Sequence, residues 1–297
     1  MPPEAMENLV EPALLRKLER LAIAARRVQL GATKGERKSK RKGASVEFAD
    51  YRDYVQGDDL RHIDWNIYGR LDTLYLKLFQ EQEDLTVFLL LDGSRSMAFG
   101  TPNKFDFARR LAAAIGYVGL VGFDRVVAET LSTEGVRRLE PVRGKASARK
   151  LFAFLSSLEA GGGTDLEAQC RAFTLRNRPK GVVLLVSDFF DEEGFEGAVK
   201  HLAACGSDVY AVQVLAPEEI SPSLMGDLKL VDSETQAFTE ITVSRSLMKR
   251  YERNRDAFLE RVRRFCHARG IGHFAVSSDT PIDYLTLDLM RKGGMFR

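Results

Sequence analysis

Three short polar clusters contain the residue types that hold a hard metal ion. The first is Asp92-Gly93-Ser94-Arg95-Ser96, with the pattern DxSxS, and the second is the glycine-rich run at 161–165. The third is Ser187-Asp188. Carboxylate and hydroxyl oxygens, without imidazole or thiolate, suit Mg²⁺, Mn²⁺ or Ca²⁺ better than zinc. The predicted metal ligands are Asp92, Ser94, Ser96, Thr164 and Asp188.

Each cluster taken singly has an ordinary structural explanation. A carboxylate at a strand end often caps a turn, and Thr164 is placed to cap a helix that follows it. Together, the clusters make an all-oxygen set with only two carboxylates. We therefore expect a bound ion to keep one coordination position open for an acidic group from another molecule.

The elements between these clusters predict how the polar residues meet. From residue 85 onward, apolar strands alternate with helical segments, which is typical of a doubly wound, mostly parallel sheet covered on both faces. Ligands of such sheets bind beyond the carboxyl ends of the strands. The expected strands are 85–91, 125–131, 136–139, 181–186, 208–215 and 273–276, with a hairpin at 228–231 and 237–241. The expected helices are 104–121, 146–158, 166–175, 195–204 and 245–269.

Residues 1–84 are predicted to form an N-terminal extension before an α/β domain at 85–297. Apolar residues recur at three- and four-residue intervals and predict a helix over 12–29 that docks on the domain. The segment 34–42 is rich in Lys and Arg and predicts an exposed loop. The run at 74–79 is strand-like.

Composition excludes several classes of protein. The chain has 297 residues with 44 Lys and Arg against 42 Asp and Glu, so no global field attracts nucleic acid or an anionic membrane. The longest apolar stretch, at 85–91, is far shorter than the roughly 20 residues of a membrane helix. Three cysteines without CxxC spacing and the lack of a signal-peptide pattern lead us to expect a cytoplasmic protein.

The metal-ligand pattern resembles a known family. Asp92, Ser94, Ser96, Thr164 and Asp188 are similar, in order and in strand-end placement, to the metal-ion-dependent adhesion site of von Willebrand factor A domains. The resemblance implies a Rossmann-like fold of the von Willebrand A type. It also implies that a Glu or Asp of a binding partner completes the coordination of the ion.

A second resemblance covers roughly residues 31–276. The N-terminal half, followed by DxSxS and Met97, is similar to domain-of-unknown-function family 58. Members of that family are associated with MoxR-type AAA+ ATPases, so the resemblance implies a chaperone-like or assembly role beside such an ATPase. The residues that carry it are Glu47, Phe48, Tyr51, Arg52, Tyr54, Gly57, Asp58, Asp59, Arg61, Ile63, Asp64, Trp65 and Arg70.

Structural explanations are favoured for the charged motif at 57–70. Alternating charges around an aromatic residue usually form caps and salt bridges, and we expect the single tryptophan, Trp65, to be a packed anchor. The basic run at 34–42 and the basic helix near 250–264 are expected to be solvated, the latter with helix-spaced ion pairs.

These observations predict a non-enzymatic adaptor that binds an acidic protein partner through a divalent cation. One alternative is a Mg²⁺-dependent phosphoester hydrolase, although the Asp92 loop has no second carboxylate to act as acid or nucleophile. Another alternative is a nucleic-acid-binding module that uses the segments 34–42 and 250–264. We expect no specific nucleic-acid partner.

Overall fold

The chain divides into two compact units. The computed structural model describes residues 9–24, 46–56, 58–81, 85–133, 135–163, 165–191, 193–222, 226–231 and 238–296. The larger unit comprises residues 1–32 and 85–297, and the smaller unit comprises 33–84. The predicted boundary at residue 85 therefore separates the two units, but the first N-terminal segment belongs to the larger one.

A mostly parallel six-stranded sheet forms the centre of the larger unit. Its strand order is β10-β7-β6-β3-β4-β5, and only β5 runs antiparallel to its neighbour. The strands are β3 (Thr86–Asp92), β4 (Arg125–Leu131), β5 (Arg138–Arg143), β6 (Gly181–Ser187), β7 (Asp208–Leu215) and β10 (Gly272–Ser277). This mixed α/β architecture with a Rossmann-like sheet confirms the predicted class of fold.

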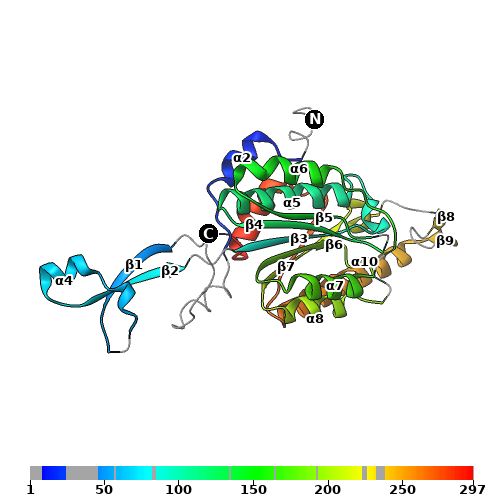
Figure 1. The fold of residues 1–297 in the computed structure, drawn as a ribbon. Helices are drawn as coiled ribbons and strands as arrows, with labels where there is room; N and C mark the ends of the chain where they lie inside the picture. Colours follow the sequence, from blue (N-terminus) through cyan, green and yellow to red (C-terminus); the bar gives the residue numbers. More distant parts are fainter. Residues whose placement is uncertain are drawn as a thin grey trace. The chain divides into compact units, whose positions relative to one another are not determined.

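Helices cover both faces of the sheet (Figure 1). One face carries α2 (Pro12–Leu18), α5 (Lys104–Val121), α6 (Ala148–Ser156) and the C-terminal helical segment α11 (Ile282–Tyr284) with its π-helical continuation (Leu285–Met290). The other face carries α7 (Leu166–Asn177), α8 (Glu196–Ala204) and α10 (Arg245–His267). Side chains of β3 alternate between the two cores, with Leu89 in one and Leu90 in the other, because successive strand residues point to opposite faces.

The predicted N-terminal helix is too long at its C-terminal end. The helix α2 ends at Leu18, and a turn follows it. Ile23 is buried and pairs as an isolated bridge with Phe296, while the amide of Ala24 donates to the carbonyl of Met295 at 2.9 Å. The extended backbone therefore buries Ile23 by pairing with the C-terminal segment, and residues 25–29 of the predicted helix lie outside the described residues.

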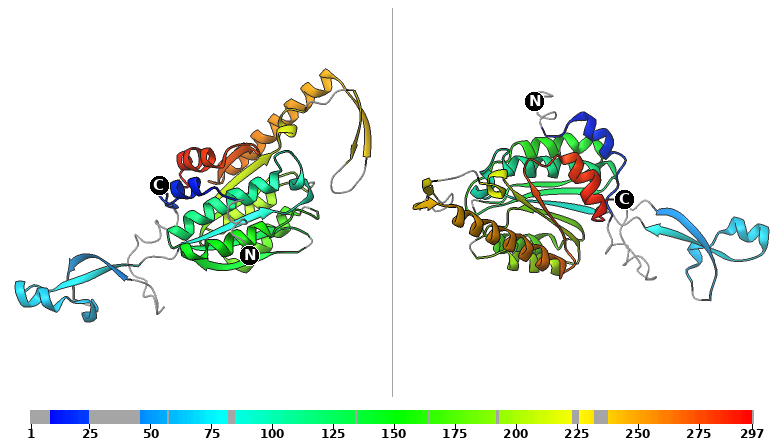
Figure 2. Two further views of the ribbon diagram at one scale, coloured as in Figure 1. Left: turned by 90° about the horizontal axis from the view of Figure 1, so that it is seen from above. Right: turned by 180° about the vertical axis from the view of Figure 1, so that it is seen from behind.

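Beyond the carboxyl end of β7, the chain forms a short helix and a hairpin. The helix α9 (Pro217–Ile220) precedes β8 (Gly226–Val231), which pairs antiparallel with β9 (Phe238–Val243) as the sequence predicted. Both views in Figure 2 show this hairpin at the N-terminal end of α10. Since α10 then leads back to β10 at the edge of the parallel sheet, its first turns lie at the end of the unit where the parallel strands terminate.

The smaller unit is built on a two-stranded antiparallel ladder. β1 (Val46–Asp53) pairs with β2 (Tyr75–Glu81), and a 3₁₀ turn (Leu60–His62) and α4 (Trp65–Leu71) lie between them in sequence. The sequence indicated β2 but neither β1 nor α4. In the described segments of both units, no helix is long and apolar enough to cross a bilayer.

Candidate metal centre

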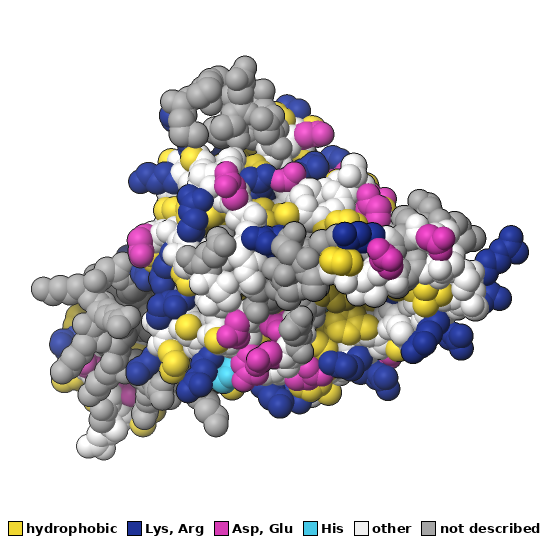
Figure 3. Space-filling view, turned by 90° about the vertical axis from the view of Figure 1, so that its right-hand side faces the viewer, with side chains coloured by type: hydrophobic (Ala, Val, Ile, Leu, Met, Phe, Trp, Pro, Cys, Tyr) yellow, Lys and Arg dark blue, Asp and Glu magenta, His cyan; other side chains and the backbone are white. Residues whose placement is uncertain are grey.

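Two buried carboxylates lie at the carboxyl ends of adjacent strands. Asp92 is the last residue of β3, and Asp188 directly follows β6. These strands are parallel neighbours in register, so both side chains reach the same edge of the sheet. Each residue is only 1% exposed. Figure 3 shows the side of the molecule on which the β8–β9 hairpin lies in Figure 1, where acidic side chains gather in the lower middle and Lys and Arg side chains are spread over the face.

Hydroxyl and amide groups hold the Asp92 carboxylate in place. The Ser94 amide donates to Oδ1 at 3.0 Å, and the Ser187 hydroxyl donates to Oδ2 at 2.5 Å. The Ser94 and Ser96 hydroxyls lie 3.0 Å apart. The DxSxS loop thus presents two hydroxyls beside one oriented carboxylate. Ser187 was absent from the predicted ligand set, although its place beside Asp188 at a strand end was a usable signal.

The glycine-rich loop lies against the DxSxS loop. The Gly161 amide donates to the Gly93 carbonyl at 2.8 Å, and the Arg95 amide donates to the Gly162 carbonyl at 3.0 Å. Gly162 has a φ of 82°, a left-handed conformation that favours glycine at this close approach. Thr164 itself lies outside the described residues, so its role as a ligand stays a prediction. Its neighbour Asp165 caps α7 by accepting the Ala168 amide at 2.8 Å.

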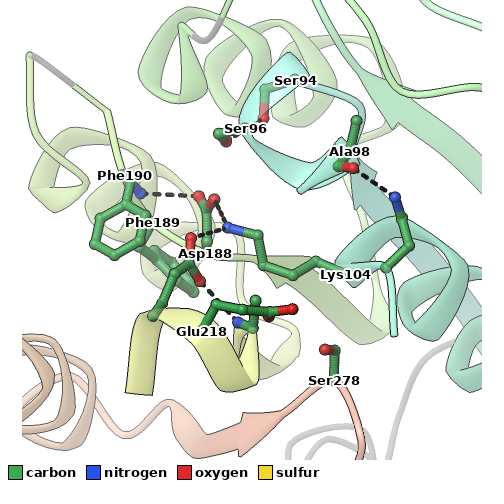
Figure 4. A network of polar contacts seen from close by, with 12 residues as sticks. Ser94, Ser96, Ala98, Lys104, Asp188, Phe189, Phe190, Glu218 and Ser278 are labelled. Atoms are coloured by element: carbon green, nitrogen blue, oxygen red, sulfur yellow. Dashed lines mark hydrogen bonds and ion pairs between the residues drawn. The ribbon is translucent and has the colours of Figure 1, made fainter. Parts of the chain in front are cut away.

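A buried lysine forms the other half of the cluster (Figure 4). Lys104 is fully buried at the start of α5, and its Nζ donates to Asp188 Oδ2 at 2.8 Å and to Glu219 Oε1 at 2.7 Å. The Phe99 and Phe190 rings lie with their centroids 5.9 and 5.5 Å from this ammonium. Sequence analysis missed Lys104, because a lysine in the first turn of a helix gives no signal that it is buried.

Backbone amides orient the two carboxylates that bind this lysine. The Phe190 amide donates to the free oxygen of Asp188 at 3.0 Å, and the Ala216 amide donates to Glu219 Oε2 at 2.7 Å. Glu219 is thereby fixed at the start of α9. Both carboxylates have hydrogen-bond donors on each oxygen before any further ligand is considered.

The electrostatics of the cluster favour an added cation. Burial and the nearby charge of Asp188 raise the pKa of Asp92 to about 6, despite the hydrogen bonds from Ser187 and Ser94. Burial would lower the pKa of Lys104, but the charges of Asp188 and Glu219 outweigh that effect and raise it. Burial also raises the pKa of Glu219.

The charge balance of the site matches a divalent cation. Three carboxylates against one ammonium leave two negative charges when all four groups are ionised. The hydroxyl oxygens of Ser94 and Ser96 are further ligands of the type that a hard cation accepts. The described residues contain no cluster of three or more His, Cys, Asp or Glu suited to a metal. The predicted ligand set is of another kind, because it combines two carboxylates with hydroxyl groups. The donor chemistry and the charge therefore both fit Mg²⁺.

The charged motif of the smaller unit forms a structural network, as the sequence predicted. Asp64 is buried and caps α4 by accepting the amides of Asn66 and Ile67 at 2.9 and 3.3 Å, while Tyr51 donates its hydroxyl to the other oxygen at 3.1 Å. Asp58 pairs with Arg52, and Asp59 pairs with Arg61, at 2.9 and 2.6 Å. The described contacts of these acids are therefore those of helix caps and turns.

Trp65 does not have the predicted role of a packed anchor. Its side chain is 61% exposed, and no other residue of α4 is buried. The ring packs edge-on against Tyr68 in the next turn. Arg70 is likewise exposed in the last turn of α4. Gly57 lies outside the described residues. The exposed ring makes Trp65 a stronger candidate for recognition than the sequence suggested.

The fold and the site together define an α/β protein with an acidic, cation-compatible cluster at the carboxyl edge of its sheet. Residues 50–260 match the family described as protein of unknown function DUF58, and the chain belongs to that family. Uncharacterized proteins of Mycobacterium tuberculosis and Mycobacterium bovis are each 26% identical to it over 296 residues, which is 98% of this chain and 92% of theirs.

Two solved structures align with parts of this chain at lower sequence identity. An aerotolerance-related membrane protein from Bacteroides fragilis is 17% identical, with a TM-score of 0.42, over 70% of this chain and 99% of that one. The pilus adhesin SpaC from Lactobacillus rhamnosus GG is 12% identical, with a TM-score of 0.44, over 72% of this chain and 30% of the adhesin.

Proposed function

We propose that this chain is a divalent-cation-dependent protein-binding adaptor with a von Willebrand A-type metal site. One observation carries the proposal. Two buried carboxylates, Asp92 and Asp188, lie at the carboxyl edge of a parallel sheet, and the Ser94 and Ser96 hydroxyls lie in the loop that follows Asp92. Together with Glu219, these carboxylates carry two more negative charges than the Lys104 ammonium balances when all four groups are ionised, which suits one divalent cation.

Asp92, Ser94, Ser96 and Asp188 would hold the cation, with Thr164 as the predicted fifth ligand. Mg²⁺ is proposed, with Mn²⁺ or Ca²⁺ as substitutes, and when bound it would supply a positive coordination site for a carboxylate of the partner. The protein's own part is preorganisation. Ser187 fixes Asp92, and Lys104 fixes Asp188, so the two carboxylates are oriented by hydrogen bonds from the fold itself.

The partner class and cellular setting follow from the family resemblance. We propose a cytoplasmic chaperone-like or assembly role beside a MoxR-type AAA+ ATPase, with an acidic side chain of a bound protein completing the site. The preformed cluster supports this role because a rigid site lowers the ordering cost of association.

Cation binding is tested first, by isothermal titration with MgCl₂ and MnCl₂. The wild-type chain is compared with Asp92→Asn, which removes one charge while keeping the shape of the side chain. Asp106→Asn is the matched control, since Asp106 is an exposed carboxylate of α5. We expect binding to be lost in Asp92→Asn and kept in the control. Equal binding by all three would contradict the proposed site.

Partner binding is tested by affinity capture with the ATPase encoded in the same organism, in Mg²⁺ and in EDTA. Retention that needs both Mg²⁺ and Asp92 would support the adaptor. Retention that is the same in Mg²⁺, in EDTA and with Asp92→Asn would contradict it. Magnesium-dependent turnover of p-nitrophenyl phosphate that Asp92→Asn abolishes would favour the hydrolase instead.

A further inference from the structure

The first turns of α10 carry a group of cations that the described protein does not neutralise. All four side chains are exposed, and none pairs with a carboxylate among the residues that the structure describes. They will be called the basic ridge. Its members are Arg245, Lys249, Arg250 and Arg253.

The later turns of the same helix contrast with the ridge. There, Arg261 pairs with Glu196 at 2.9 Å, and Arg263 and Arg264 pair with Glu260 at 2.7 and 3.4 Å. The helix-spaced ion pairs predicted for this helix thus exist in its second half. The unpaired cations are confined to the end that lies beside the strand carboxyl edge.

The position of the ridge in the helix is locally unfavourable. A helix N-terminus carries a partial positive charge, so a cation in its first turn is less favourable than an anion there. The first turn of α10 contains Arg245 and no acidic residue. Arg245 and Lys249, and Lys249 and Arg253, are like charges four residues apart, which also repel. Such a local conflict is typical of a functional surface.

The opposite face of α10 connects the ridge to the candidate metal centre. Tyr251 donates its hydroxyl to the Glu219 carbonyl at 2.6 Å, and the Arg255 guanidinium donates to the Ile220 carbonyl. Both carbonyls belong to α9, whose Glu219 side chain holds Lys104. At 100° per residue, the ridge lies on the side of α10 opposite Tyr251 and Arg255 and therefore faces away from α9. The contacts of Tyr251 and Arg255 thus link the helix that carries the ridge to α9 and, through Glu219, to the centre.

We propose that the basic ridge docks an acidic segment of a protein partner, the same partner whose carboxylate completes the metal site. The proposal rests on the proposed function for that second contact, and charge complementarity selects the occupant. A nucleic-acid backbone fits less well, since its continuous phosphates would meet the exposed Glu252 and Asp256 beside the ridge. An acidic segment can place its charges only where the ridge lies.

The test uses a fluorescein-labelled peptide that repeats Glu-Asp-Gly four times, titrated with the full chain and followed by anisotropy. Lys249→Gln combined with Arg253→Gln removes half of the ridge. Arg263→Gln combined with Arg264→Gln is the control, since it removes the same charge from the ion-paired half of the helix. We expect about tenfold weaker binding for the ridge variant, less than twofold for the control, and weaker binding by the wild type at high salt. The four substituted side chains, of Lys249, Arg253, Arg263 and Arg264, are all exposed, so both variants are expected to fold.

EDTA and Asp92→Asn separate this proposal from the function proposed above. Loss of peptide binding in the ridge variant, with no effect of EDTA, would support the ridge and contradict the metal site. Equal weakening in the ridge variant and the control would overturn the ridge, even if EDTA abolished binding. Tighter binding of a 20-nucleotide single-stranded DNA than of the peptide, lost with the ridge variant, would also overturn it in favour of a nucleic-acid surface.

Discussion

Lys104→Met removes the only charge among the described residues that hydrogen-bonds both Asp188 and Glu219, while keeping an apolar stem of similar length. Lys104 and Asp188 are 0% and 1% exposed at the side chain, and Glu219 is 17% exposed. Removing one partner of a buried ion pair leaves an uncompensated charge, which costs about 3–5 kcal/mol. We expect the free energy of unfolding of the larger unit to fall by about that amount at pH 7 in EDTA.

Urea unfolding followed by far-UV circular dichroism measures this loss. Lys200→Met is the matched control, because Lys200 is exposed on α8, and it should change the unfolding free energy by less than about 0.5 kcal/mol. The raised pKa of Lys104 means that its stabilising charge is fully present below pH 10.5, the ordinary lysine value, and is lost only as the pH rises through the higher folded value. The comparison at pH 7 therefore measures the whole contribution.

A double-mutant cycle with Asp188→Asn shows whether the loss belongs to the pair. Asp188→Asn removes the charge that Lys104→Met leaves unpaired, so the double variant should lose less than the sum of the single variants, by about 0.5–3 kcal/mol. A loss below about 1 kcal/mol for Lys104→Met, or strict additivity, would refute the reasoning that a buried charge balance organises this site.

Three further predictions concern other groups. In EDTA, the raised pKa of Asp92 means that its contribution to the unfolding free energy falls as the pH rises from about 4 to about 6. Asp92→Asn should therefore gain up to about 3 kcal/mol over the wild type in urea unfolding at pH 7 and less at pH 4, and a difference that does not change with pH would contradict this. Trp65→Ala should cost less than about 1 kcal/mol in urea unfolding, and Trp65 fluorescence should be readily quenched by iodide, whereas a large cost would mean that the ring is packed. N-ethylmaleimide should label the half-buried Cys205 before Cys170 and Cys266, whose burial raises their thiol pKa values, to about 12 for Cys266; mass spectrometry that finds Cys170 labelled first would overturn the assignment.

Much of the larger unit was predictable from local sequence. The helix over 104–121 and the strand over 208–215 have the predicted bounds, because each is an uninterrupted apolar or amphipathic run. Asp92 and Asp188 were predicted to meet because parallel strands end at one edge of a sheet. The N-terminal helix was overestimated, since Leu21 continues the helical spacing while the backbone turns to pair near Phe296.

The residues that sequence reasoning missed depend on contacts between distant segments. Lys104 binds Asp188 across 84 residues and Glu219 across 115 residues. No local pattern around Lys104 indicates either of these contacts. Trp65 shows the opposite failure. A large aromatic ring predicts burial, but α4 belongs to a small unit in which Ile63 and Leu76 are the only buried apolar side chains among those that the structure describes.

The edge strand β5 has a consequence for how this protein associates. Pro141 lies exposed in β5, next to the irregularity in its pairing with β4. Proline has no amide hydrogen, and a bulge twists the strand locally, so a further strand cannot pair regularly along this border. Growth of the sheet into fibrils or strand-swapped dimers is therefore disfavoured on the β5 side, which leaves the loops and helices free for specific contacts.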